Sequence, residues 1–319
     1  MKILVTGGAG FIGSNFLRYM VNKYPNYEFV NYDKLTYAGN LDNLLDIDSM
    51  PNYSFVKGDV CNLDFLTEIL RDVDVVIHFA AESHVDLSIG NSLAFTKSNT
   101  YGTHVLLEAA RVCKVKKFIH FSTDEVYGDI INGKFSETDK LDPSNPYSAS
   151  KAAAEMIVQA YSKTFKLPII MTRGNNNYGP YQYPEKIIPR FATDLMMDRK
   201  IPLHNPNPFR TYLHVDDTSR AVDIILHKGV IGETYNIGTE DEFRNIEIAK
   251  KCLDYFGKDE SYIEHVQDRP FNDLRYSVVL TKLQNLGWKQ EISFEKGFID
   301  TLKWYEENRA WWEKLILKN

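Results

Sequence analysis

Short apolar runs alternate with longer amphipathic stretches along the first half of the chain, and this alternation limits the possible folds more than any other feature. The apolar runs, which we expect to be strands, lie at 2–6, 28–32, 53–57, 74–79, 117–122 and 168–172. They are almost continuously apolar, which is typical of parallel strands buried on both faces. Helices are expected at 11–22, 98–112 and 147–164. The pattern predicts a doubly wound α/β sheet.

The pattern becomes less regular after about Arg173. Prolines and asparagines cluster at 175–184 and 204–208, which predicts loops, and helices are expected at 187–197, 246–256 and 294–307. We therefore expect two units. Residues 1–175 form the sheet domain, to which segments near 211–240 return, and residues 176–319 form a smaller C-terminal substrate-binding lobe.

Charge and cysteine usage argue against several classes of partner. The net charge is −6 and no basic run is present, so we expect neither nucleic acid nor a membrane surface as partner. The apolar start of the sequence is too short for a signal peptide or a membrane span. Cys61, Cys113 and Cys252 are far apart and are interpreted as buried thiols. We expect a cytoplasmic protein without a bound metal ion.

A glycine-rich turn, Thr6-Gly7-Gly8-Ala9-Gly10-Phe11-Ile12-Gly13, links the first expected strand to the first helix. Such glycines let a pyrophosphate approach a helix N-terminus, where free N–H groups and the helix dipole favour anions. Asp33 ends the second strand twenty residues after Gly13. A carboxylate there accepts hydrogen bonds from both ribose hydroxyls and repels a 2′-phosphate, so we expect NAD and not NADP. Asp59, after the third strand, is a weaker candidate for a contact with adenine.

Tyr147 and Lys151 lie four residues apart at the start of an expected helix, which places both side chains on one face. Lowering the pKa of a phenol from about 10 to about 7 requires roughly 4 kcal/mol. An ammonium about 4 Å away supplies that order of energy at an effective dielectric constant near 20. We expect Lys151, together with a positively charged nicotinamide, to make Tyr147 a base that takes a hydroxyl proton while hydride leaves the same carbon.

With the strand that ends in Ser122-Thr123, these motifs resemble the extended short-chain dehydrogenase/reductase family. The resemblance implies a Rossmann-type fold and a catalytic set of Thr123, Tyr147 and Lys151. It also implies cofactor contacts from Gly7, Gly10, Phe11, Ile12, Gly13, Asp33, Lys34, Asp59, Val60, Ala80, Ala81, Asn99, Tyr147 and Lys151.

Two adjacent acids, Asp124 and Glu125, follow the strand that ends in Thr123. Ligands bind at the carboxyl ends of strands in such sheets. Oxidation of a hexose at C4 acidifies the hydrogen on C5, so one carboxylate can remove that proton while the other acid protonates the departing C6 hydroxyl. Like charges this close do not ionise together readily, so we expect one of the two to be protonated.

Further motifs extend the resemblance to the dTDP-glucose 4,6-dehydratases over nearly the whole chain. They are Thr36-Tyr37-Ala38-Gly39-Asn40, Glu82-Ser83-His84-Val85-Asp86, Asn176-Asn177-Tyr178-Gly179-Pro180 and Pro184-Glu185-Lys186. The resemblance implies that Asp124 is the acid at the C6 hydroxyl and Glu125 the base at C5. It also implies contacts to the nucleotide sugar from Ser83, His84, Thr123, Asn176, Lys186, Ile187, Arg210, Asn236, Arg269 and Asn272.

The nucleotide base stays open. Phe271-Asn272-Asp273 and Thr172-Arg173-Gly174-Asn175-Asn176 resemble the UDP-glucose 4,6-dehydratase part of rhamnose synthases more than the thymidine-nucleotide enzymes. A diphosphate bound to an acidic protein needs local cations and amide donors in either case.

Two other functions share these motifs. A nucleotide-sugar 4-epimerase or decarboxylase uses the same oxidation step, but epimerisation needs no acid at C6, so Asp124-Glu125 favours the dehydratase. A catalytically silent NAD-binding or scaffold protein is the second alternative, and intact Tyr147, Lys151, Asp124 and Glu125 argue against it. We also expect a homodimer, because the family commonly pairs two helices per subunit, here those at 98–112 and 147–164.

Overall fold

The computed structural model describes residues 1–268 and 273–317 of the chain. Within them a parallel sheet of seven strands has the order β11-β6-β5-β4-β1-β2-β3. The strands are β1 (Lys2–Thr6), β2 (Glu28–Asp33), β3 (Tyr53–Lys57), β4 (Val75–His78), β5 (Lys117–Thr123), β6 (Ile169–Gly174) and β11 (Thr234–Ile237). The doubly wound sheet predicted from the sequence is confirmed.

Helices cover both faces of the sheet, which explains why its central strands are almost continuously apolar. Ile3 and Val5 of β1 belong to one core with helices α1 (Phe11–Lys23) and α8 (Val215–Lys228). Leu4, between them, points to the opposite core, formed with α2 (Leu63–Ile69), α5 (Gly102–Val112) and α6 (Pro146–Phe165). Successive side chains of a strand alternate between its faces, so a strand in this position must be apolar at every residue.

Strand β3 departs from the prediction of a buried strand. It lies at the edge of the sheet, and Ser54 and Lys57 are exposed. The cysteines also differ from expectation: Cys252 is buried, whereas Cys61 and Cys113 are only partly buried. The α-helix expected at 98–112 begins only at Gly102, as α5, because the residues before it form a π-helical segment, η3 (Thr96–Tyr101).

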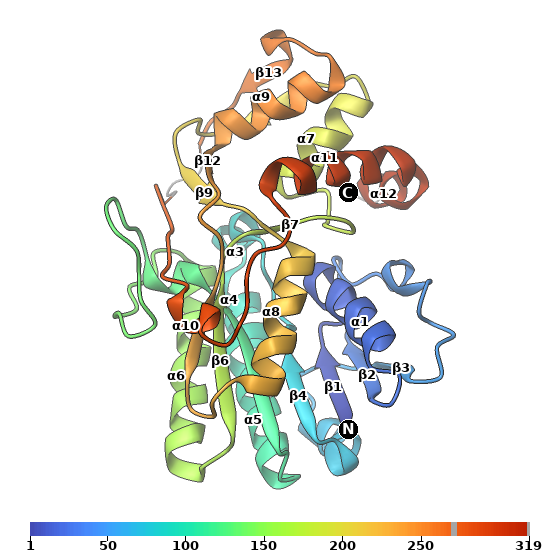
Figure 1. Cartoon of the computed structure of the whole chain (residues 1–319), viewed down its shortest axis with the longest axis vertical. Coiled ribbons are helices and arrows are strands. Elements are labelled where there is room, and N and C mark those ends of the chain that lie inside the picture. The colour runs from blue at the N-terminus through green and yellow to red at the C-terminus, as the bar shows by residue number, and fades with distance from the viewer. Residues whose placement is uncertain (269–272, 318–319) are drawn as a thin grey trace.

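The chain leaves the sheet after β6 and builds a lobe over the carboxyl ends of the strands (Figure 1). Its helices are α7 (Ile187–Met196), α9 (Asn245–Phe256), α11 (Phe294–Glu307) and α12 (Arg309–Ile316). They enclose a separate aromatic core around Phe294, Tyr305 and Trp312. In between, the chain returns to the sheet domain, where α8 packs beside α1 and β11 pairs with β6.

Short strand pairs and turns complete the structure. In the lobe and its base, β8 (Ile201–Leu203) pairs with β13 (Ile263–His265), β9 (Phe209–Thr211) with β12 (Glu242–Arg244), and β7 (Asn177–Tyr178) with β10 (Leu213–His214). The remaining short helices are η1 (Leu41–Leu44), η2 (Leu70–Asp72), α3 (Val85–Gly90), α4 (Ser92–Phe95), η4 (Asp124–Tyr127), η5 (Glu260–Tyr262) and α10 (Thr281–Gln284).

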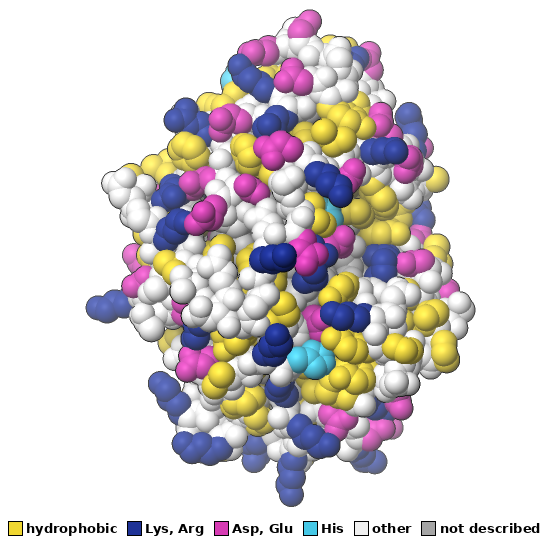
Figure 2. Space-filling model, in the orientation of Figure 1, with side chains coloured by type: hydrophobic (Ala, Val, Ile, Leu, Met, Phe, Trp, Pro, Cys, Tyr) yellow, Lys and Arg dark blue, Asp and Glu magenta, His cyan; other side chains and the backbone are white. Residues whose placement is uncertain are grey.

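Acidic and basic side chains are intermingled over the lobe, in the upper part of Figure 2. Among the helices that the structure describes, none combines the length and the apolar character needed to cross a lipid bilayer.

Candidate active site

A cavity of about 480 Å³ lies between the carboxyl ends of the strands and the lobe. Strand ends supply one wall, including Asp33 after β2, Gly58 after β3 and Thr123 at the end of β5. The lobe supplies the other wall, including Lys186 at the start of α7 and Arg210 in β9. Nearly all the predicted site residues that the structure describes line this cavity.

The glycine turn forms one end of the cavity. Gly7 has a positive φ of 71°, which glycine adopts without strain. A Cβ atom added to Gly13 would lie 2.2 Å from the Gly7 carbonyl oxygen, so the close passage of turn and helix needs a glycine there. Gly10 caps α1 and has no side chain to bond the first amides of the helix, which face the cavity with Phe11 and Ile12. This arrangement fits a pyrophosphate group.

Asp33 stands at the end of β2 with only 8% of its surface exposed. Its Oδ2 accepts a hydrogen bond from the Ala9 amide (3.0 Å), and its Oδ1 accepts one from the Leu35 amide (2.8 Å). Burial raises the pKa of this carboxyl, and the two amides oppose that effect. The carboxylate is therefore held in a fixed place on the wall next to the glycine turn, where a ribose of a bound dinucleotide fits.

The neighbouring strand ends continue this wall. Lys34 Nζ forms an ion pair with Asp59 Oδ2 at 2.8 Å, so Asp59 faces a lysine at the mouth of the cavity. Val60, Ala80 and Ala81 also line it. Asn99 does not, which corrects the prediction of a direct cofactor contact. Its side chain lies behind the wall and bonds both backbone groups of Glu82 and the Ser150 hydroxyl, because η3 packs beneath that segment.

Tyr147 and Lys151 come from the first turns of α6. Asn145 caps this helix, accepting from the Ser148 amide, and Pro146 takes its first position. Lys151 Nζ donates to the Phe121 carbonyl at 2.7 Å, and burial lowers its pKa to about 8. Burial and the Glu125 carboxylate raise the pKa of the Tyr147 phenol. The lowering of the Tyr147 pKa by Lys151 together with a positively charged nicotinamide stays a prediction. In this structure the Lys151 ammonium bonds a carbonyl, and burial outweighs its effect on the Tyr147 pKa.

Asp124 and Glu125 lie in the turn η4, directly after β5. Glu125 lines the cavity, and its Oε2 accepts from Asn145 Nδ2 at 3.3 Å. Asp124 lies behind Glu125 and does not line the cavity, so its contact with the C6 hydroxyl stays a prediction. It is 2% exposed, and its Oδ2 accepts from Asn175 Nδ2 at 2.5 Å. Burial and the neighbouring Glu125 raise the pKa of Asp124 to about 7. Burial also raises the pKa of Glu125.

The shift gives Asp124 the properties of an acid at neutral pH. A carboxyl with a pKa near 7 can carry a proton and release it in the same reaction. The amides of Asn145 and Asn175 set the orientation of both carboxyls, and sequence reasoning missed their roles. Asn145 precedes a proline at a helix start and could have been recognised as a cap. Asn175 carries no comparable signal, since its contact with Asp124 joins β6 to the end of β5.

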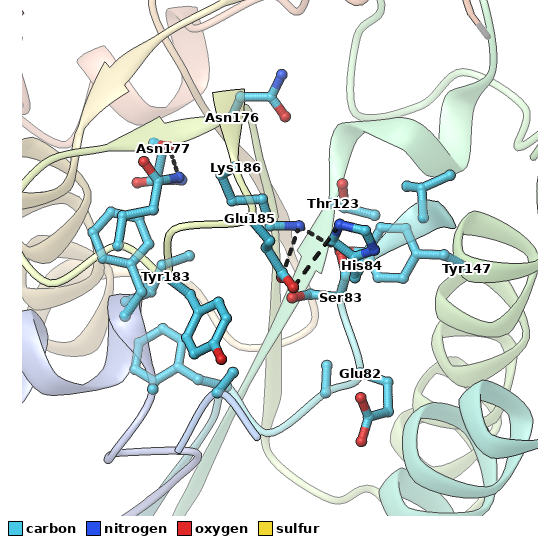
Figure 3. A pocket seen from close by; sticks show the side chains of 18 of the residues that line it. Glu82, Ser83, His84, Thr123, Tyr147, Asn176, Asn177, Tyr183, Glu185 and Lys186 are labelled. Carbon is cyan, nitrogen blue, oxygen red and sulfur yellow. Dashed lines mark hydrogen bonds and ion pairs between the residues drawn. The ribbon is translucent and has the colours of Figure 1, made fainter. Parts of the chain in front are cut away.

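On the lobe side, Lys186 and Glu185 point across the cavity toward Ser83 and His84 (Figure 3). Lys186 Nζ donates to the Ser83 carbonyl at 3.0 Å. His84 Nε2 lies 3.9 Å from Glu185 Oε2, and the Tyr37 hydroxyl donates to Glu185 Oε1 at 3.1 Å. Asn176 and Ile187 also line the cavity. A cation and a histidine thus lie where an anionic substrate group can sit.

Arg210 is held near the two acids. Its Nη2 donates to the Asp273 carbonyl at 2.8 Å, and its guanidinium carbon lies 5.0 Å from the centre of the Tyr276 ring. Arg269 and Asn272, also predicted to contact substrate, lie outside the described residues.

Asn236 is not at the cavity, contrary to prediction. It is fully buried in β11, and its side chain bonds the Tyr127 hydroxyl and the carbonyls of Phe135 and Val279. Strand β11 turns this residue toward the interior of the sheet domain, so it cannot reach a nucleotide. In the described parts of the chain, 1–268 and 273–317, no group of three or more His, Cys, Asp or Glu side chains is placed to hold a metal ion.

Comparisons with known proteins agree with this geometry. Residues 4–301 match the family model described as GDP-mannose 4,6 dehydratase. The chain is 44% identical over 321 residues to a dTDP-glucose 4,6-dehydratase of Streptomyces niveus, covering 99% of this chain and 96% of that protein. A crystal structure of dTDP-glucose 4,6-dehydratase from Streptomyces venezuelae with NAD bound superimposes with a TM-score of 0.97 at 44% identity, covering 99% of this chain and 100% of that one.

A plant relative is similar over half of its own length. The chain is 48% identical over 320 residues to a trifunctional UDP-glucose 4,6-dehydratase/UDP-4-keto-6-deoxy-D-glucose 3,5-epimerase/UDP-4-keto-L-rhamnose-reductase of Arabidopsis thaliana. The alignment covers 98% of this chain and 48% of that protein, so the chain spans about half the length of this relative. The family resemblance inferred from the motifs is confirmed.

Proposed function

Because the chain belongs to the GDP-mannose 4,6 dehydratase family, we propose that it is an NAD-dependent nucleotide-sugar 4,6-dehydratase. It converts dTDP-glucose or UDP-glucose to the 4-keto-6-deoxy derivative with loss of water. The observation that carries the proposal is the acid pair Asp124-Glu125 in the turn beside Tyr147 and Lys151. A 4-epimerase or decarboxylase would use Tyr147 and Lys151 but has no use for an acid at C6.

The glycine turn and Asp33 hold NAD. The turn leaves the first α1 amides without a side-chain cap, where they would bind the pyrophosphate, and Asp33 would accept hydrogen bonds from the hydroxyls of the adenosine ribose. When bound, NAD accepts a hydride from C4 of the hexose and returns one to C6, so that it is not consumed.

The residues of the chain handle the protons. Tyr147 takes the proton of the C4 hydroxyl, and the charges of Lys151 and of a bound nicotinamide would together favour the phenolate. Glu125 removes the proton on C5, and Asp124 protonates the C6 hydroxyl, whose bond to carbon breaks as water leaves. Glu125 returns its proton to C5 when C6 is reduced. One proton is then in excess on Tyr147 and one is missing from Asp124, so a single transfer between them resets the site.

The diphosphate and hexose lie against the lobe. Lys186 and Arg210 are cations on that wall, and Asn176 is an amide donor beside them. In a chain with a net charge of −6 these groups supply the local positive potential that a diphosphate requires.

We infer that two copies of the chain associate through α5 and α6. The outer face of α6 presents Ala149, Ala153, Met156 and Ala160, all exposed, at helical spacing. Tyr101 before α5 and Phe165 at the end of α6 are 53% and 49% exposed. An apolar stripe of this kind on α6, with exposed Tyr101 and Phe165 nearby, is suited to an interface with a second copy.

The proposed function is tested by incubating the purified chain with dTDP-glucose and, separately, with UDP-glucose, without added reductant. The expected product is the 4-keto-6-deoxy nucleotide sugar, and relative turnover identifies the preferred base. The Glu125→Gln substitution should leave C4 oxidation partly intact but stop the loss of water, because the amide cannot accept the C5 proton. A Glu125→Gln variant that dehydrates normally would show that Glu125 is not the base.

A further inference from the structure

A buried arginine joins the two halves of the proposed active site. Arg173, in β6, is 3% exposed, and its Nε and Nη2 donate to the carboxylate of Glu155 at 3.1 and 2.7 Å. Its Nη1 donates to the Tyr127 hydroxyl at 2.7 Å. None of these three residues lines the cavity, so substrate binding does not account for them.

The two partners of Arg173 belong to different catalytic elements. Glu155 lies one helical turn after Lys151 in α6, the helix that carries the oxidation residues. Tyr127 is the last residue of η4, the turn that carries Asp124 and Glu125. The guanidinium therefore connects the helix used for C4 oxidation to the turn used for water loss.

Tyr127 is held on several sides. The guanidinium carbon of Arg173 lies 4.6 Å from the centre of its ring, and Phe135 stacks on the ring at 4.9 Å. Its hydroxyl accepts from Arg173 and donates to Asn236 Oδ1 at 2.8 Å. The rigid fork of a guanidinium can bond a carboxylate and a hydroxyl at once, which a lysine ammonium does not reproduce.

We propose that Arg173 and Tyr127 are positioning residues for the elimination step, which fix turn η4 and its two acids relative to α6 and the bound hexose. The inference rests on the proposed function. It predicts that loosening the contact between Arg173 and Tyr127 slows water loss while C4 oxidation continues, because Tyr147 and Lys151 keep their own supports in α6. The reduced form of the cofactor should then accumulate during turnover.

Two variants test this prediction. Tyr127→Phe keeps the stacked ring and removes the hydroxyl. Arg173→Lys keeps a positive charge opposite Glu155 and removes the hydrogen bond to the Tyr127 hydroxyl. In each, formation of the 4-keto-6-deoxy product should fall about 10-fold or more, since small misplacements of reacting groups cost that order of rate. The rate of C4 oxidation, followed by the near-ultraviolet absorbance of the reduced cofactor, should change less than about 2-fold.

Tyr24→Phe is the matched control. The Tyr24 hydroxyl donates to buried Asp223 at 2.9 Å in a network of α1 and α8 that also includes Lys23. Like Tyr127→Phe, this variant loses a phenol hydroxyl from a charged network, so we expect the melting temperatures of the two variants to fall by similar amounts. Tyr24→Phe should not, however, accumulate reduced cofactor.

The outcomes separate the two proposals. Equal loss of oxidation and elimination in Tyr127→Phe and Arg173→Lys, or no change in either step, overturns the positioning role. If the variants give such a result while the unmodified chain forms the 4-keto-6-deoxy product, only the positioning role of Arg173 and Tyr127 is overturned, and the proposed function stands. If the unmodified chain forms this product from neither nucleotide sugar, the proposed function itself is contradicted.

Discussion

Replacing Asp124 by asparagine should stabilise the folded protein at neutral and alkaline pH while it removes the proposed acid. Asp124 is 2% exposed and next to Glu125, and burial together with that neighbour raises its pKa from 3.8 to about 7. An asparagine has nearly the same shape and no charge. Its amide oxygen can accept from Asn175, and its amide nitrogen can face the Thr123 hydroxyl, which rotates to accept.

The magnitude follows from the pKa difference between the folded and unfolded states. A difference of about 3 at 1.36 kcal/mol per pKa unit corresponds to about 4 kcal/mol. Because the folded pKa is raised, the stability contributed by the neutral acid is complete below about pH 4 and is lost as the pH rises to about 7. The advantage of Asp124→Asn should therefore grow from near zero at pH 4 to about 4 kcal/mol above pH 7.

The assay is the urea midpoint or melting temperature of both proteins without ligands, measured between pH 4 and pH 9. In a chain of this size, about 4 kcal/mol corresponds to roughly 5–10 °C in melting temperature. Product formation should be lost in the same variant, because asparagine cannot protonate the C6 hydroxyl. Stability and activity should thus move in opposite directions.

Asp59→Asn is the control, for which we expect a stability change of the opposite sign. Partial burial disfavours the ionised Asp59, but Lys34 and the Cys61 amide outweigh this and lower its pKa. Its carboxylate should therefore stabilise the fold above the ordinary pKa of an aspartate, and Asp59→Asn should destabilise it there. If Asp124→Asn unfolds at the same midpoint as the unmodified protein at pH 8, or if the gap does not depend on pH, burial does not control the protonation of Asp124.

Three further predictions concern the cofactor and the assembly. Gly13→Ala should abolish NAD binding, since the added Cβ would lie 2.2 Å from the Gly7 carbonyl oxygen. The control Gly90→Ala, whose Cβ meets nothing within 4 Å, should bind NAD normally. Equal NAD affinities of the two variants in a titration would contradict the role of the glycine turn in binding the pyrophosphate. Asp33→Ala should lower the affinity for NAD by about 10-fold and remove the discrimination against NADP. A variant that still rejects NADP would show that another group selects the cofactor. Met156→Glu should give monomers in sedimentation by placing charges on the apolar stripe of α6, while Ile299→Glu on α11, similarly exposed, should not; a dimer that survives Met156→Glu would place the interface elsewhere.

Part of this protein could be derived from its sequence because the relevant physics is local or periodic. Six strands of the central sheet could be located, all but β11, because burial on both faces demands apolar residues at successive positions, as in Ile3, Leu4 and Val5. The glycine turn and Asp33 could be recognised because a close backbone approach and a strand end are encoded within a few residues. The spacing of Tyr147 and Lys151 placed them on one helical face.

Only the tertiary structure decided what surrounds each of these groups. Sequence spacing says which side chains share a face but not which atoms they meet, so the bond from Lys151 to the Phe121 carbonyl and the raised pKa of Tyr147 were not foreseen. Asn99 and Asn236 were expected at the cavity, yet packing turns both into the interior. The burial of Asp124 against Asn175, and the link from Arg173 to Tyr127, join segments about fifty residues apart. Desolvation and charge pairing depend on such distant neighbours, and therefore on the folded chain.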